Sequence, residues 1–242
     1  MPDLPAIDHK LAIVVPYRDR AEHLAAFVPH MRTYFERHPV DYSIHIVEQA
    51  GTGPFNRGAL KNVGFDLSKA LADYVCFHDI DYLPVDADYS YPDKPTRLIW
   101  HGLRVTEDYE RFWGGVILFR REHFQAVNGY SNGYRGWGFE DIELRLRCDF
   151  AGVGRAYRDG TYTGLAHVHS GLRPDGNWTE EAAANKARFD DKRPDLVDGY
   201  LSEGLNSLNY RVLDSAPLVL GGATWPNIFR HLVEIEDLPL TP

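Results

Sequence analysis

The sequence predicts an α/β protein with a Rossmann-like, mostly parallel central sheet flanked by helices. Two observations support this fold class. Short apolar runs alternate with longer segments in which apolar residues recur every three or four positions. Polar and charged residues also cluster directly after several of these runs, where the strands of a parallel sheet would end. Strands that alternate with helices pair side by side in one direction, with the helices covering the sheet.

The first half of the chain contains three predicted strands and two predicted helices in strict alternation. The strands are Leu11–Pro16, Tyr42–Val47 and Tyr74–Phe77. The first helix carries apolar residues at helical spacing, namely Leu24, Phe27, Val28, Met31, Tyr34 and Phe35. The second begins at an Asn56 cap and carries Leu60, Val63 and Leu67. This order predicts parallel neighbours.

The second half contains shorter elements. Further strands are predicted at Arg97–Trp100, Val116–Phe119, Thr161–His169, Asn209–Leu213 and Asn227–Ile235. A helix is predicted over Glu140–Phe150, with Ile142, Leu146 and Phe150 facing inward. The Gly-, Pro- and Asp-rich stretch from Gly171 to Asn177 is predicted to be a mobile loop and a candidate lid. Because no linker separates the halves, we expect a single domain over residues 1–242.

Composition excludes several classes of protein. A formal net charge of −9 argues against a nucleic-acid binder, which needs a basic face. No apolar run approaches the roughly twenty residues of a transmembrane segment, and the N-terminus lacks the features of a signal peptide. We therefore expect a cytoplasmic protein, either free or peripheral at the inner membrane. Cys76 and Cys148 fall inside predicted elements, as expected of buried free thiols.

An acidic triplet follows the third strand and is the strongest functional signal. Residues two apart on an extended chain face the same side, so Asp79 and Asp81 can both face a divalent cation at the carboxyl end of the strand. Open α/β sheets bind ligands at that end. His167 and His169 are spaced in the same way and can complete a site with Asp81 that suits Mn²⁺. The alternatives are an acidic turn and a solvated pair of histidines.

Two more polar clusters follow the first and second strands. Arg18 and Arg20 lie where bidentate contacts to phosphate or carboxylate are possible, and Tyr17 can stack on a base. Surface pairing of these arginines with Glu22 is the alternative. Phe55, Asn56 and Arg57 follow the second strand and can hold a ribose or base, although Asn56 equally suits a helix cap.

A glycine-rich turn around Trp137 leads into the helix that begins with Glu140 and Asp141. An aromatic platform beside two carboxylates is typical of carbohydrate sites. Acidic residues in a first helical turn are also favoured by the helix dipole alone, so a structural role for them remains the alternative.

These segments together resemble the β1,4-galactosyltransferases of glycosyltransferase family 7, over nearly the whole chain. Six motifs occur in the family's order: Val15–Arg20, Phe55–Arg57, Asp79–Asp81, Trp113–Gly115, Gly136–Asp141 and Gly204–Ser207. The pair His167 and His169 is most similar to the xylosylprotein galactosyltransferase branch.

The resemblance implies a GT-A glycosyltransferase fold whose nucleotide-binding half spans about residues 10–85, with the acceptor and metal-completing half over about 86–242. It implies an inverting transfer of galactose from UDP-galactose to a saccharide or glycolipid acceptor, forming a β1,4 linkage. Mn²⁺ would be held by Asp81, His167 and His169, Asp141 would be the catalytic base and Glu140 would position the sugars. The resemblance assigns the donor nucleotide to Pro16, Tyr17, Arg18, Arg20, Phe55, Asn56, Arg57, Asp79, Ile80 and Asp81. It assigns the sugars to Phe112, Trp113, Gly114, Gly115, Trp137, Gly138 and Glu140.

Three departures from the family pattern bear on specificity and setting. Phe112 stands where many members have a tyrosine beside the donor sugar, and Ile142 stands where animal members have a second aspartate. The chain also begins almost at the first strand, without the anchor and stem of the animal enzymes. From this we expect a bacterial enzyme of surface polysaccharide or glycolipid synthesis. Transfer of N-acetylgalactosamine or another UDP-hexose, and a noncatalytic carbohydrate-binding protein, are the alternatives.

Overall fold

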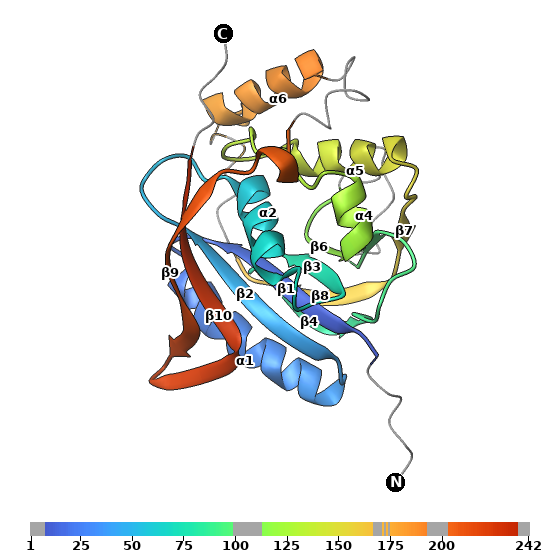
Figure 1. The fold of residues 1–242 in the computed structure, drawn as a ribbon. Coiled ribbons are helices and arrows are strands. Elements are labelled where there is room, and N and C mark those ends of the chain that lie inside the picture. The colour runs from blue at the N-terminus through green and yellow to red at the C-terminus, as the bar shows by residue number, and fades with distance from the viewer. Residues whose placement is uncertain are drawn as a thin grey trace.

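The computed structural model describes residues 8–98, 113–166, 171, 173, 175–192 and 203–236. Its centre is an eight-stranded sheet in the order β7-β5-β6-β3-β1-β2-β10-β9, and a separate pair is formed by β4 and β8 (Figure 1). The strands are β1 Lys10–Tyr17, β2 Asp41–Gln49, β3 Tyr74–His78, β4 Tyr82–Ala87, β5 Thr96–Arg97, β6 Val116–Arg120, β7 Ala156–Tyr157, β8 Gly160–Gly164, β9 Tyr210–Leu220 and β10 Ala223–Ile235. The helices are α1 Ala21–Arg37, α2 Arg57–Ser68, α4 Arg121–Ala126, α5 Glu140–Phe150 and α6 Glu180–Lys192, with a short 3-10 helix η2 at Leu205–Ser207.

The middle of the sheet is parallel, as predicted. Strand β1 pairs in parallel with β2 and β3, and β2 pairs in parallel with β10. The flanks are antiparallel, since β6 runs against β3 and β9 runs against β10. The fold class predicted from the sequence is therefore confirmed.

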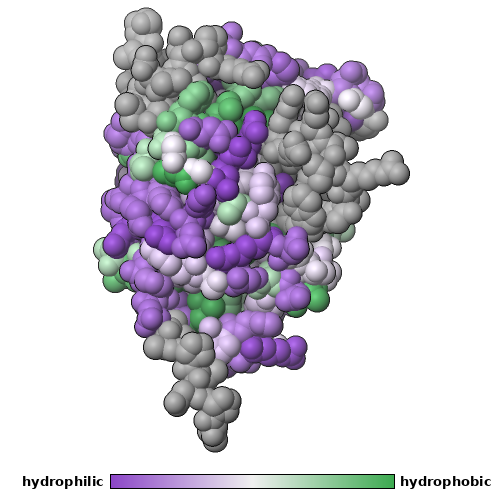
Figure 2. Space-filling model, turned by 90° about the vertical axis from the view of Figure 1, so that its right-hand side faces the viewer, coloured by the Kyte–Doolittle hydropathy of each residue, from purple (hydrophilic) through white to green (hydrophobic). Residues whose placement is uncertain are grey.

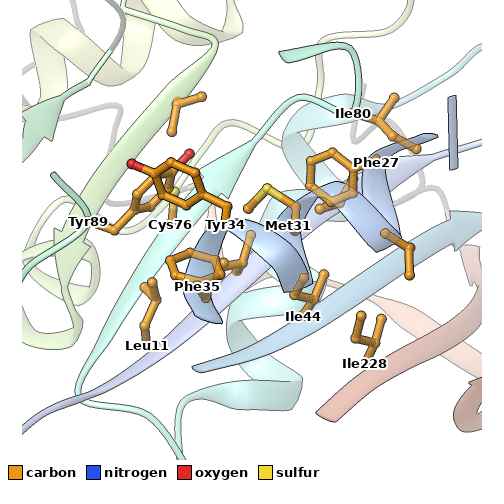
Figure 3. Close-up of a cluster of buried hydrophobic side chains, with 14 of the residues drawn as sticks. Leu11, Phe27, Met31, Tyr34, Phe35, Ile44, Cys76, Ile80, Tyr89 and Ile228 are labelled. Carbon is orange, nitrogen blue, oxygen red and sulfur yellow. The ribbon is translucent and has the colours of Figure 1, made fainter. Parts of the chain in front are cut away.

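Alternation along the central strands builds a core on each face of the sheet. In β1, Leu11, Ile13 and Val15 pack on the side covered by α1, whereas Val14 packs on the side covered by α2. Figure 3 shows part of the first cluster, in which Phe27 and Met31 of α1 meet residues of the sheet. On the other face α2 approaches β1 closely. A Cβ added to Gly64 would lie 2.3 Å from Cγ1 of Val14, so this contact requires glycine.

The strand order brings the polar clusters to one edge. From β1 the chain moves to β2 on one side and then crosses to β3 on the other, so the direction of winding reverses at β1. The crevice outside the carboxyl ends of strands at such a reversal is where open α/β sheets bind ligands. Strands β1, β2 and β3 end at Tyr17, Gln49 and His78, next to the three predicted ligand-binding segments.

The inward face predicted for α5 is wrong. Phe150 is 43% exposed, and Ile142 and Leu146 are only partly buried. The buried face carries Leu144 and Cys148 together with charged residues, of which Glu143 and Arg147 form an ion pair of 2.6 Å with both side chains fully inaccessible. A hydrophobic pattern cannot reveal a helix face whose buried residues neutralise one another.

The prediction for the two cysteines is confirmed. Cys76 and Cys148 are both buried and unpaired. Among the described residues, no helix combines the length and apolarity needed to cross a bilayer. Figure 2 shows a face on which hydrophobic side chains form small groups separated by hydrophilic ones.

Candidate active site

The acidic triplet forms a turn between β3 and β4 rather than an extended segment. The backbone N–H of Tyr82 donates to the carbonyl of Asp79 over 3.3 Å, and the N–H of Asp79 donates to the carbonyl of Gly115 over 3.0 Å. Ile80 is 7% exposed and joins the core beside Phe27 (Figure 3). The turn arises because β3 and β4 belong to different sheets. Its backbone contact to Gly115 brings the Trp113–Gly115 motif next to Asp79.

Two cations from α2 meet the carboxylate of Asp79. Nη1 of Arg57 lies 3.7 Å from Oδ2, and Nζ of Lys61 lies 3.7 Å from Oδ1. The two cationic residues are four positions apart and therefore share one face of the helix. The helix begins here because the side chain of Asn56 accepts the N–H of Ala59 over 2.9 Å.

Glu140 and Asp141 reach the same place from the start of α5. Nη1 of Arg57 is 3.3 Å from Oε1 of Glu140, so Arg57 joins the two acidic segments. Phe139, directly before the helix, has a φ of 76°, a left-handed conformation that costs energy for a residue with a side chain. Both carboxyl groups are buried, and Oδ1 of Asp141 accepts the N–H of Ile142 over 2.8 Å.

The crowding of charges shifts their pKa values in opposite directions. Burial lowers the pKa of Arg57, but the carboxylates of Asp79, Glu140, Asp141 and Asp81 outweigh burial and raise it above its ordinary value. Burial raises the pKa of Asp79, but Lys61 and Arg57 outweigh it and lower the pKa. Burial, followed by the charge of Glu140, raises the pKa of Asp141 to about 7. The site thus holds one carboxyl group suited to proton transfer near neutral pH.

A network of contacts fixes the loops around this cluster. Nη1 of Arg18 donates to the carbonyl of Gly53 over 2.6 Å, and its guanidinium lies over the Phe55 ring at 5.3 Å. The N–H of Gly136 donates to the carbonyl of Phe55 over 2.7 Å, which ties the second and fifth motifs together. Tyr17 is only 8% exposed and belongs to the core, so its ring offers little surface to a base in this conformation. Asn56 is fully buried, with its amide donating to the carbonyl of Asn132.

The Trp137 segment is held from α6. Nδ2 of Asn185 donates to the carbonyls of Arg135 and Trp137 over 2.8 and 2.9 Å. Gly171, at the start of the candidate lid, lies against the indole, since an added Cβ would be 2.3 Å from Cδ2 of Trp137. The turn also needs Gly138, whose φ is 97°. Trp137 therefore lies against the first residue of the predicted lid and three residues before Glu140 in the sequence.

Trp113 is not an exposed aromatic surface on which a sugar could stack. Its indole is fully buried and meets the ring of Tyr157 edge to face at 5.3 Å. The sugar-binding prediction for this segment therefore depends on the Gly114 and Gly115 backbone. Phe112, His167 and His169 lie outside the described residues.

The described part of the site carries an excess of negative charge. Arg57 and Lys61 face Asp79, Asp81, Glu140 and Asp141, which gives two positive and up to four negative formal charges. Such an excess fits a divalent cation. Within the described residues, however, no three His, Cys, Asp or Glu side chains are grouped closely enough to hold an ion. Of the predicted ligand set Asp81, His167 and His169, only Asp81 lies within the described residues.

Sequence reasoning missed Lys61 and Tyr130. Lys61 is 1% exposed, and its Nζ lies 5.0 Å from the centre of the Tyr130 ring. A signal was present, because a lysine four residues after Arg57 lies on the same helix face as that predicted site residue. Tyr130 gave no comparable signal, since an aromatic residue before a turn usually belongs to the core.

Two family models match the chain. The N-terminal region of glycosyl transferase group 7 matches residues 2–92, and the N-terminal domain of galactosyltransferase matches residues 97–169. The catalytic domain of Drosophila β1,4-galactosyltransferase 7, solved with xylobiose, has a TM-score of 0.73 and 31% identity, with 95% of each chain covered. A variant of that enzyme solved with manganese, UDP-Gal and xylobiose has the same TM-score, identity and coverage.

Curated relatives of the same name are also similar to this chain. β1,4-galactosyltransferase 7 of Drosophila melanogaster is 39% identical over 67% of this chain and 53% of its own length. The Homo sapiens protein of that name is 34% identical over 89% of this chain and 65% of its own length. This chain thus spans between about half and two thirds of the curated relatives it matches. The fold and the acidic cluster at its carboxyl edge define the class, a GT-A glycosyltransferase fold. Within that class, the chain belongs to glycosyltransferase group 7.

Proposed function

We propose that this chain is an inverting, metal-dependent galactosyltransferase that moves galactose from UDP-galactose to a sugar hydroxyl and forms a β1,4 linkage. The observation that carries the proposal is the meeting of three motifs around Arg57, which lies 3.7 Å from Asp79 and 3.3 Å from Glu140, next to a carboxyl group with a pKa of about 7. The names of the relatives and the ligands of the Drosophila complexes support the choice of donor.

Asp141 is the catalytic base in this proposal. Its carboxylate accepts the proton of the acceptor hydroxyl as that oxygen attacks the anomeric carbon from the face opposite the departing UDP, which inverts an α-linked donor to a β-glycoside. Burial and the Glu140 charge keep Asp141 basic enough for this role. Glu140, Trp137 and Gly138 position the sugars, and closure of the loop after residue 170 excludes water that would hydrolyse the donor.

The donor nucleotide is assigned to the edge where β1, β2 and β3 end. Arg18, Arg20 and Arg57 supply charge for the diphosphate, and the Phe55 segment borders the nucleotide. A divalent cation held by Asp81, His167 and His169 would act as a Lewis acid that neutralises the leaving diphosphate. Manganese in the related Drosophila complex supports Mn²⁺ as that ion.

The acceptor is a saccharide or glycolipid, and we propose a role in surface polysaccharide or glycolipid synthesis. Xylosides are the first acceptors to test, because the related Drosophila catalytic domain was solved with xylobiose. Phe112 stands where the family pattern has a tyrosine beside the donor sugar, so the hydroxyl that helps to select galactose is absent. UDP-N-acetylgalactosamine is therefore the rival donor.

The test is a donor screen with the purified chain, Mn²⁺ and a xyloside acceptor. UDP-galactose, UDP-N-acetylgalactosamine and UDP-glucose are compared with and without a chelator, and the linkage of the product is determined by NMR. We expect chelator-sensitive transfer of galactose to give a β1,4 product. Preference for UDP-N-acetylgalactosamine would contradict UDP-galactose as the donor. UDP binding without any turnover would favour a noncatalytic carbohydrate-binding protein.

A further inference from the structure

Lys61 is a buried cation directly behind the acidic turn. Its side chain is 1% exposed, and its Nζ contacts Oδ1 of Asp79 at 3.7 Å and faces the Tyr130 ring at 5.0 Å. The carboxylate and the aromatic face both stabilise an ammonium group that has been removed from water. Lys61 therefore sits between the core and the ligand-binding edge.

Packing alone does not account for a lysine at this position. Leu60 and Val63, on the same helix, fill the core on this face of the sheet without burying a charge. Removing a charge from water is costly, and replacing a buried ion pair by apolar residues of similar volume is often neutral or stabilising. Because the Lys61 ammonium faces the Asp79 carboxylate, its presence is better explained by its neutralising and orienting that carboxylate.

The two oxygens of Asp79 are divided between two cations. Oδ1 faces Lys61 and Oδ2 faces Arg57, so the plane of the carboxylate is fixed from the protein side. The Asp79 backbone is also anchored through Gly115. Arg57, however, is shared with Glu140 at 3.3 Å and its side chain is 25% exposed, so it is the cation that a ligand can reach.

We propose that Lys61 is a positioning residue that holds Asp79 in place and thereby leaves Arg57 available to the donor diphosphate. This inference rests on the proposed sugar transfer. Asp79 is the carboxylate that both cations face, so Lys61 still neutralises it when Arg57 turns to a phosphate. Without Lys61, the same movement of Arg57 would leave Asp79 without a facing cation. Such a loss weakens interactions with the donor and leaves the acceptor side unchanged.

The central variant is Lys61→Met, which keeps the length of the side chain and removes its charge. We expect the affinity for UDP in the presence of Mn²⁺, measured by calorimetry, to fall about ten- to a hundredfold. The KM for UDP-galactose should rise and the KM for the acceptor should stay within about twofold. Lys69→Met is the matched control, because Lys69 follows the same helix and its side chain is 45% exposed. This control should bind UDP as the wild type does.

A double-mutant cycle with Asp79→Asn separates positioning from a structural role. If Lys61 acts through Asp79, Lys61→Met should cause almost no further loss of UDP affinity in the Asp79→Asn background. Tyr130→Phe, which keeps the ring face, should bind UDP as the wild type does, whereas Tyr130→Leu should weaken binding. Additive losses in the cycle, or normal UDP affinity of Lys61→Met, would overturn the inference.

The same assays distinguish this inference from the proposed function. A wild-type protein that transfers no galactose contradicts the proposed function. An active wild type with an equally active Lys61→Met variant contradicts only the positioning role. If Lys61→Met does not fold, Lys61→Gln keeps a hydrogen-bond donor near Asp79 without the charge, and the same cycle is measured with it.

Discussion

Asp141 owes its proposed role to its surroundings rather than to its residue type. It is buried beside Glu140 at the start of α5, whereas Asp79, which is also a site carboxylate, faces two cations and has a lowered pKa. The surroundings of these two aspartates shift their pKa values in opposite directions, which suits the proposed base to accept a proton and Asp79 to stay charged.

Replacement of Asp141 by asparagine should abolish transfer without abolishing donor binding. The amide has nearly the same shape as the carboxyl group but cannot accept the proton of the acceptor hydroxyl, so kcat should fall by at least about a hundredfold. UDP affinity in the presence of Mn²⁺, measured by calorimetry, should change little. A variant that retains full activity would remove Asp141 as the base.

The pH dependence of the reaction should report the same carboxyl group. Because the pKa of Asp141 is raised to about 7 by burial and by Glu140, the fraction of usable base should fall as the pH drops through neutrality. We expect kcat/KM to decline on the acid side. Glu140→Gln removes the neighbouring negative charge and should move that decline to lower pH. An acid limb that is identical in both proteins would show that another group controls it.

At the scale of elements, periodicity predicted where strands and helices lie but not which helix faces are buried. The six apolar positions predicted for α1 are all buried, because that helix covers the sheet with ordinary hydrophobic residues. In α5 the buried positions include Glu143 and Arg147, which a hydrophobic pattern assigns to the surface. Similarly, alternation assumes an extended chain, and the turn at Asp79 broke that assumption. The motifs predicted segments that the structure brings together at Arg57, Asp79 and Glu140. The burial of Lys61 depends on its contacts with Asp79 and Tyr130, which spacing along one helix does not show.

The buried ion pair of α5 should be important for stability. Arg147 donates to Glu143 and also to the carbonyls of Gly129 and Glu203, so it joins α5 to two loops. Arg147→Met removes these buried hydrogen bonds and leaves Lys192, 3.0 Å from Oε1, as the cation that still faces the Glu143 carboxylate. The free energy of unfolding should fall by about 2 kcal/mol or more. Chemical denaturation measures this loss.

A surface pair with the same spacing provides the control. Lys186 and Asp190 of α6 are also four residues apart, and their side chains are about half exposed. Lys186→Met should cost no more than about 0.5 kcal/mol in the same denaturation experiment. Equal losses from the two variants would contradict the importance assigned to the buried pair.

At the scale of the whole molecule, the pairing of β10 with β2 joins the two ends of the described chain in one sheet. Strand β10 lies next to β2, so residues near the end of the described chain complete the parallel centre of the sheet. His45 of β2 and His231 of β10 cross this junction, with Nδ1 of His45 lying 3.0 Å from Nε2 of His231. Ser43 and Ser215 continue the chain of hydrogen bonds at its two ends, at 3.0 and 2.8 Å.

This histidine pair should make global stability depend on pH. Only one hydrogen can lie between the two facing nitrogens, so protonation of both rings destroys the bond. Burial, then the charges of His231 and Lys10, lowers the pKa of His45 from 6.5 to about 3, and burial lowers the pKa of His231. The unfolded chain therefore binds more protons than the folded one between about pH 6.5 and about pH 3. The stabilisation is fully present above pH 6.5 and is lost as the pH falls through that window, by at most about 1.4 kcal/mol per pH unit for His45.

Denaturation curves recorded between pH 8 and pH 4 measure this dependence. His45→Leu removes the titrating group at position 45, so the free energy of unfolding should decline less steeply below pH 6.5 than in the wild type. At pH 7 the variant should be less stable than the wild type, because His231 has lost its hydrogen-bond partner at position 45. His9→Gln, at an exposed histidine, should retain the wild-type slope. If the free energy of unfolding of His45→Leu and of the wild type declined equally with falling pH, other groups would dominate acid unfolding. The histidine pair between β2 and β10 would then not be the source of the pH dependence.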